Sequence, residues 1–144
     1  MKKIGIIGGM SWESSQIYYK IINEKVRELL GGFNSASCLM ESVNFAEIES
    51  LMQKDDWNSL DAQMVRAVKN LEAGGAELFI LCTNSMHLCA DAMTAKAQIP
   101  FIHIADATAE QVKKAGLKKV LLLGTRFTMS RDFYKDKLLN DHRI

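Results

Sequence analysis

Short apolar segments alternate along this chain with longer segments whose apolar residues recur at helical spacing. A short apolar run bounded by glycine or polar residues is typical of a buried strand, whereas apolar residues three and four positions apart are typical of a helix. The expected strands are 3–7, 35–43, 77–81, 101–104 and 119–123, and the expected helices are 12–30, 57–73, 85–96, 105–115 and 130–139, with 44–56 irregular or partly helical. This alternation predicts an α/β fold, a doubly wound parallel sheet of flavodoxin-like or Rossmann-like type.

The composition excludes several classes of protein. The 144 residues can form a domain with a hydrophobic core, and a net charge of +1 with interspersed acidic and basic residues argues against a nucleic-acid partner. No apolar run is long enough to span a membrane, so we expect no membrane partner, and the run after Lys2 and Lys3 is too short for a signal peptide. The odd number of cysteines, three, favours reduced thiols, and we expect a cytoplasmic protein.

Ligands of doubly wound sheets bind beyond the carboxyl ends of the strands. In this chain that rule selects the loops 8–14, 42–48, 82–87 and 124–129. In the first loop Gly8 and Gly9 permit a tight turn, and Ser11 is a candidate N-cap of a helix whose N-terminus would attract a carboxylate or phosphate. The spacing G-x-x-G-G does not match the dinucleotide fingerprint, and a turn that merely links strand to helix is the alternative.

Cys82 is the candidate catalytic residue, because it ends a buried strand and directly precedes an expected helix. A helix N-terminus lowers the pKa of a nearby thiol, so we expect a reactive thiolate near neutral pH. The neighbouring Thr83, Asn84 and Ser85 supply polar groups that can hold a carboxylate or an amino group. The alternative is that Cys82 is a small buried apolar residue, as many free cysteines are.

The remaining loop residues and cysteines are weaker candidates for a functional role than Cys82 and its neighbours. Thr125 and Thr128 offer hydroxyl groups, whereas Arg126 is either a carboxylate partner or a surface charge. Cys89 and Cys38 are expected in the core, and His87 is expected to be exposed or hydrogen-bonded, with a supporting role as the alternative. The spacing of Cys82, His87 and Cys89, C-x4-H-x-C, is not a familiar zinc pattern, so we expect no metal.

Four segments spread over nearly the whole chain carry a more specific signal than any single loop. They are 6–14 (IIGGMSWES), 81–87 (LCTNSMH), 103–108 (HIADAT) and 123–129 (LGTRFTM). In this order they resemble the aspartate/glutamate racemase family. The resemblance implies two similar α/β domains that face each other across a cleft, so that residues 1–117 would be the first domain and residues 118–144 the incomplete beginning of the second.

The same resemblance implies cofactor-independent racemisation of aspartate or glutamate by two cysteines, one removing the α-proton and the other delivering a proton to the opposite face. By this resemblance Cys82 is the first catalytic cysteine. The implied substrate-binding residues are Met10, Ser11, Thr83, Asn84 and Ser85, with Thr125 and Thr128 from the second domain.

The chain departs from the family pattern because the second cysteine motif, late in the second domain, is not present. We therefore expect impaired two-base racemisation. One-cysteine isomerisation or decarboxylation of a small dicarboxylate, and acidic-ligand binding without catalysis, are the alternatives. Val120, Leu121, Leu122 and Phe133 should lack packing partners in an unfinished domain, so we expect a homo-oligomer.

Overall fold

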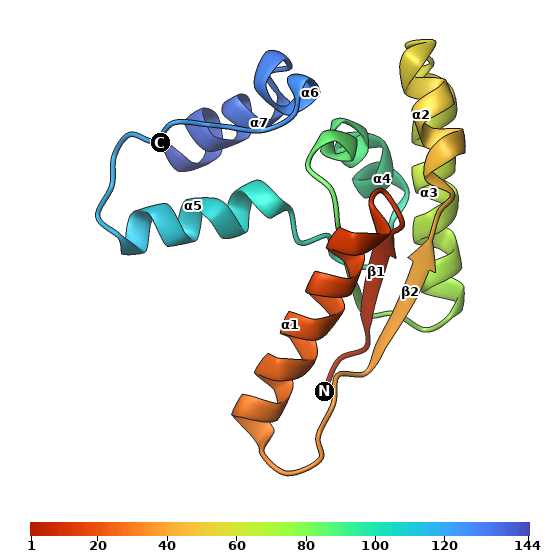
Figure 1. The fold of residues 1–144 in the computed structure, drawn as a ribbon, viewed down its shortest axis with the longest axis vertical. Coiled ribbons are helices and arrows are strands. Elements are labelled where there is room, and N and C mark those ends of the chain that lie inside the picture. The colour runs from red at the N-terminus through yellow and green to blue at the C-terminus, as the bar shows by residue number, and fades with distance from the viewer.

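A computed structural model describes all residues, 1–144, and its centre is a parallel three-stranded sheet in the order β2-β1-β3 (Figure 1). The central strand β1, Ile4–Gly8, pairs with β2, Cys38–Ser42, on one side and with β3, Leu78–Leu81, on the other. The register places Ile7 beside Leu81, the residue before Cys82. The expected α/β class with a parallel sheet is confirmed.

Helices cover both faces of this sheet. They are α1 Trp12–Leu30, α2 Phe45–Gln53, α3 Trp57–Ala73, the 3₁₀ helix η1 Ser85–Cys89, α4 Ala90–Lys96, α5 Ile104–Lys114, α6 Arg126–Ser130, α7 Phe133–Asp136 and the π-helix η2 Lys137–Asp141. In Figure 1, α1 lies on one face and α3 on the other. The helix α1 approaches β1 so closely that a Cβ atom at Gly8 would overlap the Ser15 side chain.

The main hydrophobic core lies between α3 and the sheet. Leu60, Met64, Val68 and Leu71 lie on one face of α3 and are fully buried, as their helical spacing predicts. They pack against apolar residues of the strands, among them Ile7, Phe79 and Leu81. Each such side chain stabilises the fold by about 1.5–3 kcal/mol relative to an exposed one, so this layer holds the site-bearing strand ends in place.

The prediction of two further strands was wrong. In the expected strand 101–104 only Phe101 forms a bridge, with Phe79, because the chain turns into α5 at Ile104, where His103 is the N-cap. The segment 119–123 has no neighbouring strand to pair with, and Leu121 is 81 % exposed. A strand forms only beside another strand that pairs with its backbone N–H and C=O groups. The apolar composition of 119–123 could not reveal that this segment has no neighbouring strand.

A second, smaller core joins α5 to the C-terminal helices, which lie together in Figure 1. It contains Ala105, Ala109, Tyr134 and Leu138, with Leu122 and Phe133 packed against it. Thus Leu122 and Phe133 have partners, contrary to expectation, whereas Val120 and Leu121 stay exposed. The expected helix 130–139 begins only at Phe133, where α7 starts, and continues directly into the π-helix η2. The domain boundary at residue 117 stays a prediction.

Long apolar helices are absent from the structure, and none of its helices could cross a membrane.

Candidate active site

The glycine loop after β1 is shaped by close contacts that exclude side chains. Gly9 has φ +93°, and a Cβ atom there would overlap the Val43 carbonyl oxygen. Its N–H donates to Ser15 Oγ at 2.9 Å, and Ser15 Oγ donates to the Ser11 carbonyl at 3.1 Å. Ser11 is the N-cap of α1, as expected, because its side chain accepts a hydrogen bond from the Ser14 N–H. The N-terminus of α1 is thereby fixed at the carboxyl edge of the sheet.

Cys82 lies at the same edge, where β3 ends. Its N–H donates to the Ile7 carbonyl at 2.9 Å, which continues the pairing of β3 with β1 by one residue. The side chain is 2 % exposed, yet it lines a cavity of about 430 Å³. The same cavity is lined by Met10, Ser11, Thr83, Asn84, Ser85, Thr125 and Thr128. The structure therefore brings together every site residue expected from the sequence, and their chemical roles stay predictions.

Five further residues line this cavity: Ser14, Tyr18, Phe45, Ile104 and Gly124. Tyr18 was missed, although its spacing of four residues from Ser14 places both on one face of α1. Phe45 lies within the segment 42–48 that the strand-end rule selected, where it is the first residue of α2. Ile104 could not be found from sequence, because its position depends on where the chain turns into α5.

The segment that follows α5 contributes Gly124, Thr125 and Thr128 to the cavity wall. The hydroxyl oxygens of Ser85 and Thr125 lie 3.0 Å apart, and those of Thr125 and Thr128 lie 3.2 Å apart. Thr125 is also the N-cap of α6. A chain of three hydroxyl groups thus runs from the loop after β3 to the first turn of α6.

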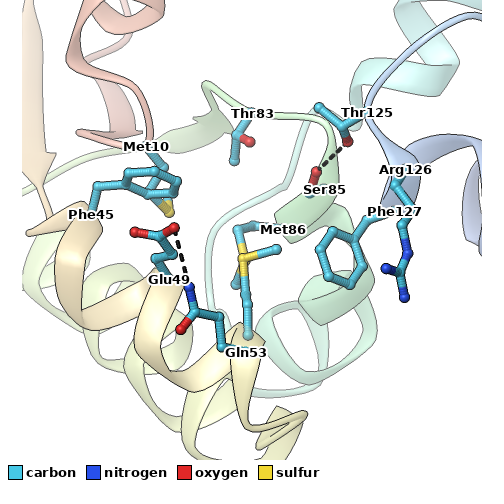
Figure 2. A pocket seen from close by; sticks show the side chains of 11 residues that line it. Met10, Phe45, Glu49, Gln53, Thr83, Ser85, Met86, Thr125, Arg126 and Phe127 are labelled. Atoms are coloured by element: carbon cyan, nitrogen blue, oxygen red, sulfur yellow. Dashed lines mark hydrogen bonds between the residues drawn. The ribbon is translucent and has the colours of Figure 1, made fainter.

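Next to this cavity lies a second one of about 530 Å³, drawn in Figure 2. The two share Met10, Phe45, Thr83, Ser85 and Thr125. The additional lining residues are Glu49, Met52, Gln53, Met86, Arg126 and Phe127. Figure 2 shows the Ser85–Thr125 hydrogen bond at its edge, with Arg126 on the side of the C-terminal segment. Arg126 is exposed and also lines this second cavity, so its role, as a carboxylate partner or a surface charge, stays a prediction.

The expectation of a lowered Cys82 pKa was wrong. Burial raises the pKa of this thiol to about 12. The element that follows is the short 3₁₀ helix η1, which begins only at Ser85, so little helix dipole acts on the sulfur. Burial also raises the pKa of Tyr18, as do the nearby Cys82 and Tyr134. The burial of Cys82 therefore favours a neutral thiol.

The loop after β3 has free backbone donors. The N–H groups of Thr83, Asn84 and Ser85 make no hydrogen bond to another backbone group. All three residues line the cavity beside Cys82. Consecutive backbone N–H groups at a concave surface attract an anion, so this loop can recognise a carboxylate.

The other two cysteines lie away from this cavity. Cys89 is fully buried in the main core, as expected, and burial together with the adjacent Asp61 raises its pKa. Cys38 begins β2 and is only partly buried, so the core position expected for it was wrong. No group of three His, Cys, Asp or Glu side chains is arranged to hold a metal ion.

His87 is buried and hydrogen-bonded. Its Nδ1 lies 2.7 Å from the Thr83 carbonyl oxygen, and its Nε2 accepts from the Ile104 N–H at 3.3 Å. The neighbouring His103 accepts from the Ala105 N–H at 3.1 Å and so caps α5. Both histidines are therefore explained by their hydrogen bonds.

The family model that matches this chain is that of the Asp/Glu/Hydantoin racemases, over residues 7–142. Among solved structures, a proposed Asp/Glu racemase from Yersinia pestis is 47 % identical to this chain, with a TM-score of 0.95. The match covers 100 % of this chain and 63 % of the Yersinia pestis chain.

Two further structures are similar. An aspartate racemase homologue from Pyrococcus horikoshii OT3 is 39 % identical, with a TM-score of 0.87, and the match covers 99 % of this chain and 62 % of that homologue. The aspartate racemase of Picrophilus torridus is 25 % identical, with a TM-score of 0.70, and the match covers 100 % of this chain and 61 % of that racemase. The present chain thus spans less than two thirds of the length of these proteins.

Proposed function

Because the chain belongs to the Asp/Glu/hydantoin racemase family, we propose that it binds aspartate or glutamate beside Cys82 and that this thiol exchanges the α-proton without a cofactor. The observation that carries the proposal is the cavity at the carboxyl edge of the sheet, where the Cys82 side chain lies among polar groups of three separate loops. Such an edge is where α/β sheets bind small ligands.

The polar groups of the cavity are suited to an acidic amino acid. The free N–H groups of residues 83–85 and the N-terminus of α1 favour a carboxylate. The hydroxyl groups of Ser11, Thr125 and Thr128 accept or donate as required, so they can bind the ammonium group or a second carboxylate. These contacts would orient the α-carbon toward the sulfur.

The proposed chemistry is proton transfer at that carbon. The neutral Cys82 thiol first loses its proton to water, and the resulting thiolate takes the α-proton, which leaves a planar carbanion and a neutral thiol. After this thiol has exchanged its proton with solvent, it returns a proton to the same face of the carbon. Inversion needs a second acid on the opposite face. Cys38 and Cys89 do not line the cavity, so we propose exchange with solvent that is faster than racemisation in this chain.

Binding without turnover is the second candidate function. The observation that favours it is the raised pKa of Cys82, about 12, which leaves little thiolate at neutral pH. Under this alternative the cavity would retain its carboxylate site while the thiol acts only as part of the wall.

The experiment that separates these functions measures loss of the α-proton signal of L-aspartate in D₂O by NMR, together with chiral analysis of the product. Proton exchange that is abolished in Cys82→Ser and retained in the matched control Cys38→Ser supports the proposal. Calorimetric binding without exchange supports the second candidate. Absence of both binding and exchange, with L-aspartate and with L-glutamate, would contradict both functions.

A further inference from the structure

The side chain of His87 connects two backbone segments of the cavity wall. Its Nδ1 lies 2.7 Å from the carbonyl oxygen of Thr83, and its Nε2 lies 3.3 Å from the backbone nitrogen of Ile104. Thr83 directly follows Cys82, whereas Ile104 opens α5, and both line the cavity. One imidazole ring therefore joins the loop that carries the thiol to the first turn of a distant helix.

The two partners require a single protonation state. The Ile104 N–H can only donate, so Nε2 must accept and carries no proton. The Thr83 carbonyl can only accept, so Nδ1 must carry the proton and donate. His87 is thus a neutral imidazole with its proton on Nδ1.

The surroundings of His87 favour this neutral form. The ring is 2 % exposed, is stacked on Phe101 at 5.5 Å and meets the edge of His103 at 4.4 Å between centroids. Burial, with a smaller contribution from His103, lowers the pKa of His87 to about 4, against the opposing effects of the Thr83 and Asn84 carbonyls and Asp106. At neutral pH the ring keeps both hydrogen bonds.

We propose that His87 is a positioning residue for the acidic-ligand site: it holds the Thr83 carbonyl away from the ligand so that the loop 83–85 presents its N–H groups to a carboxylate. The C=O and N–H groups of a trans peptide point in opposite directions. A hydrogen bond from His87 to the Thr83 carbonyl therefore directs the Asn84 N–H away from the ring. This inference rests on the proposed function, because it concerns the same carboxylate site.

The matched variants each keep a different part of the side chain. In His87→Asn the amide nitrogen can replace Nδ1 and donate to Thr83, whereas in His87→Gln the amide oxygen can replace Nε2 and accept from Ile104. His87→Phe retains a planar ring for the contact with Phe101 and removes both hydrogen bonds. Each of these two amide variants keeps one of the two hydrogen bonds of His87. A difference in ligand binding between His87→Asn and His87→Gln therefore reports on the hydrogen bond to Thr83 and not on a general loss of stability.

The measurement is the concentration of L-aspartate that protects Cys82 from iodoacetamide, with the modified site located by fragment-ion mass spectrometry of the full chain. We expect His87→Phe and His87→Gln to weaken protection about tenfold, because both variants lack the hydrogen bond to Thr83, and His87→Asn to stay within about threefold of the original protein. Thermal unfolding of each variant shows whether affinity merely follows stability.

A protein without substitutions that shows no protection by aspartate or glutamate would overturn the proposed function itself. If aspartate protects the unsubstituted protein and His87→Phe equally well, the role assigned to His87 is wrong. The same holds if His87→Asn weakens binding as much as His87→Gln does. A ¹⁵N-correlated NMR spectrum of the unsubstituted chain gives a test that no folding defect can affect. It should show a protonated Nδ1 and an unprotonated Nε2, and the opposite tautomer would overturn the proposal.

Discussion

The hydroxyl oxygens of Ser85 and Thr125 lie 3.0 Å apart, although 40 positions separate them in the chain. The first opens the 3₁₀ helix η1, three residues after Cys82, and the second is the N-cap of α6. This contact fastens the C-terminal segment across the cavity. Both residues line the same cavity as Cys82.

The Ser85–Thr125 contact should be measurable as a coupling energy. Thr125→Val removes both the contact and the N-cap of α6, and should lower the free energy of unfolding by about 1 kcal/mol. In a double-mutant cycle with Ser85→Ala we expect a coupling of about 0.5–1.5 kcal/mol from urea unfolding. Thr94→Val, at an exposed position of α4, is the control. Strictly additive effects of the two substitutions would contradict the contact.

Cys82 should react slowly with iodoacetamide at neutral pH. Since burial raises the pKa of Cys82 to about 12, the fraction of thiolate should increase about tenfold for each pH unit between pH 7 and pH 10. The measurement is the alkylation rate at Cys82 by mass spectrometry, with Cys82→Ser to identify the signal. A rate that levels off near pH 7 would restore the original expectation of an activated thiolate.

His87 should make stability sensitive to mild acid. Its pKa is about 4 in the folded protein and 6.5 in an ordinary environment, so the unfolded chain binds a proton first as the pH falls. Stability is therefore complete above pH 6.5 and is lost between about 6.5 and 4, by at most about 3 kcal/mol. Burial also lowers the pKa of His103, which adds a loss in the same direction.

Urea unfolding at several pH values tests this dependence on His87. The loss between pH 6.5 and 4 should be smaller in His87→Phe, since the His87 contribution is absent there, whereas those of His103 and of carboxylates with a lowered pKa, such as Glu72, remain. Equal losses in the original protein and in the variant would show that His87 does not carry the effect.

Core packing and the exposed face of α1 should respond differently to truncation. Met64→Ala removes a fully buried side chain of α3 and should cost about 2–5 kcal/mol. Ile21→Ala, at a position 50 % exposed on α1, should change stability by less than about 0.5 kcal/mol. Chemical unfolding followed by circular dichroism measures both. A large loss in Ile21→Ala would mean that α1 is covered in solution.

Self-association stays a prediction, and the exposed apolar residues identify where to test it. Leu121 and Leu123 are 81 % and 75 % exposed, and Ile17 and Ile21 are exposed on α1. We expect sedimentation velocity to show oligomers at high concentration, and Leu121→Lys together with Ile21→Lys to shift the distribution toward monomer. Lys118→Leu is a control for added apolar surface. A monomer at every concentration would refute the expectation.

Several elements could be predicted because their signals are local. The apolar runs of β1 and β3, the helical spacing in α3 and the N-cap at Ser11 depend only on residues close in sequence. The strand-end rule also selected the loops of Met10, Thr83 and Thr125, which line one cavity. Gly9 could be recognised as a turn residue, although the nearby Val43 carbonyl that excludes a side chain could not.

The sequence by itself determined the order of strands and helices and placed Cys82 at the end of a strand, because hydrophobic period and capping are properties of neighbouring residues. Only the tertiary structure decided that the segment 119–123 remains unpaired, that Thr125 reaches Ser85 and that His87 joins Thr83 to Ile104. It also decided the raised pKa of Cys82. Strand pairing, long-range hydrogen bonds and desolvation depend on what packs against a residue from elsewhere in the chain, and no local pattern records that.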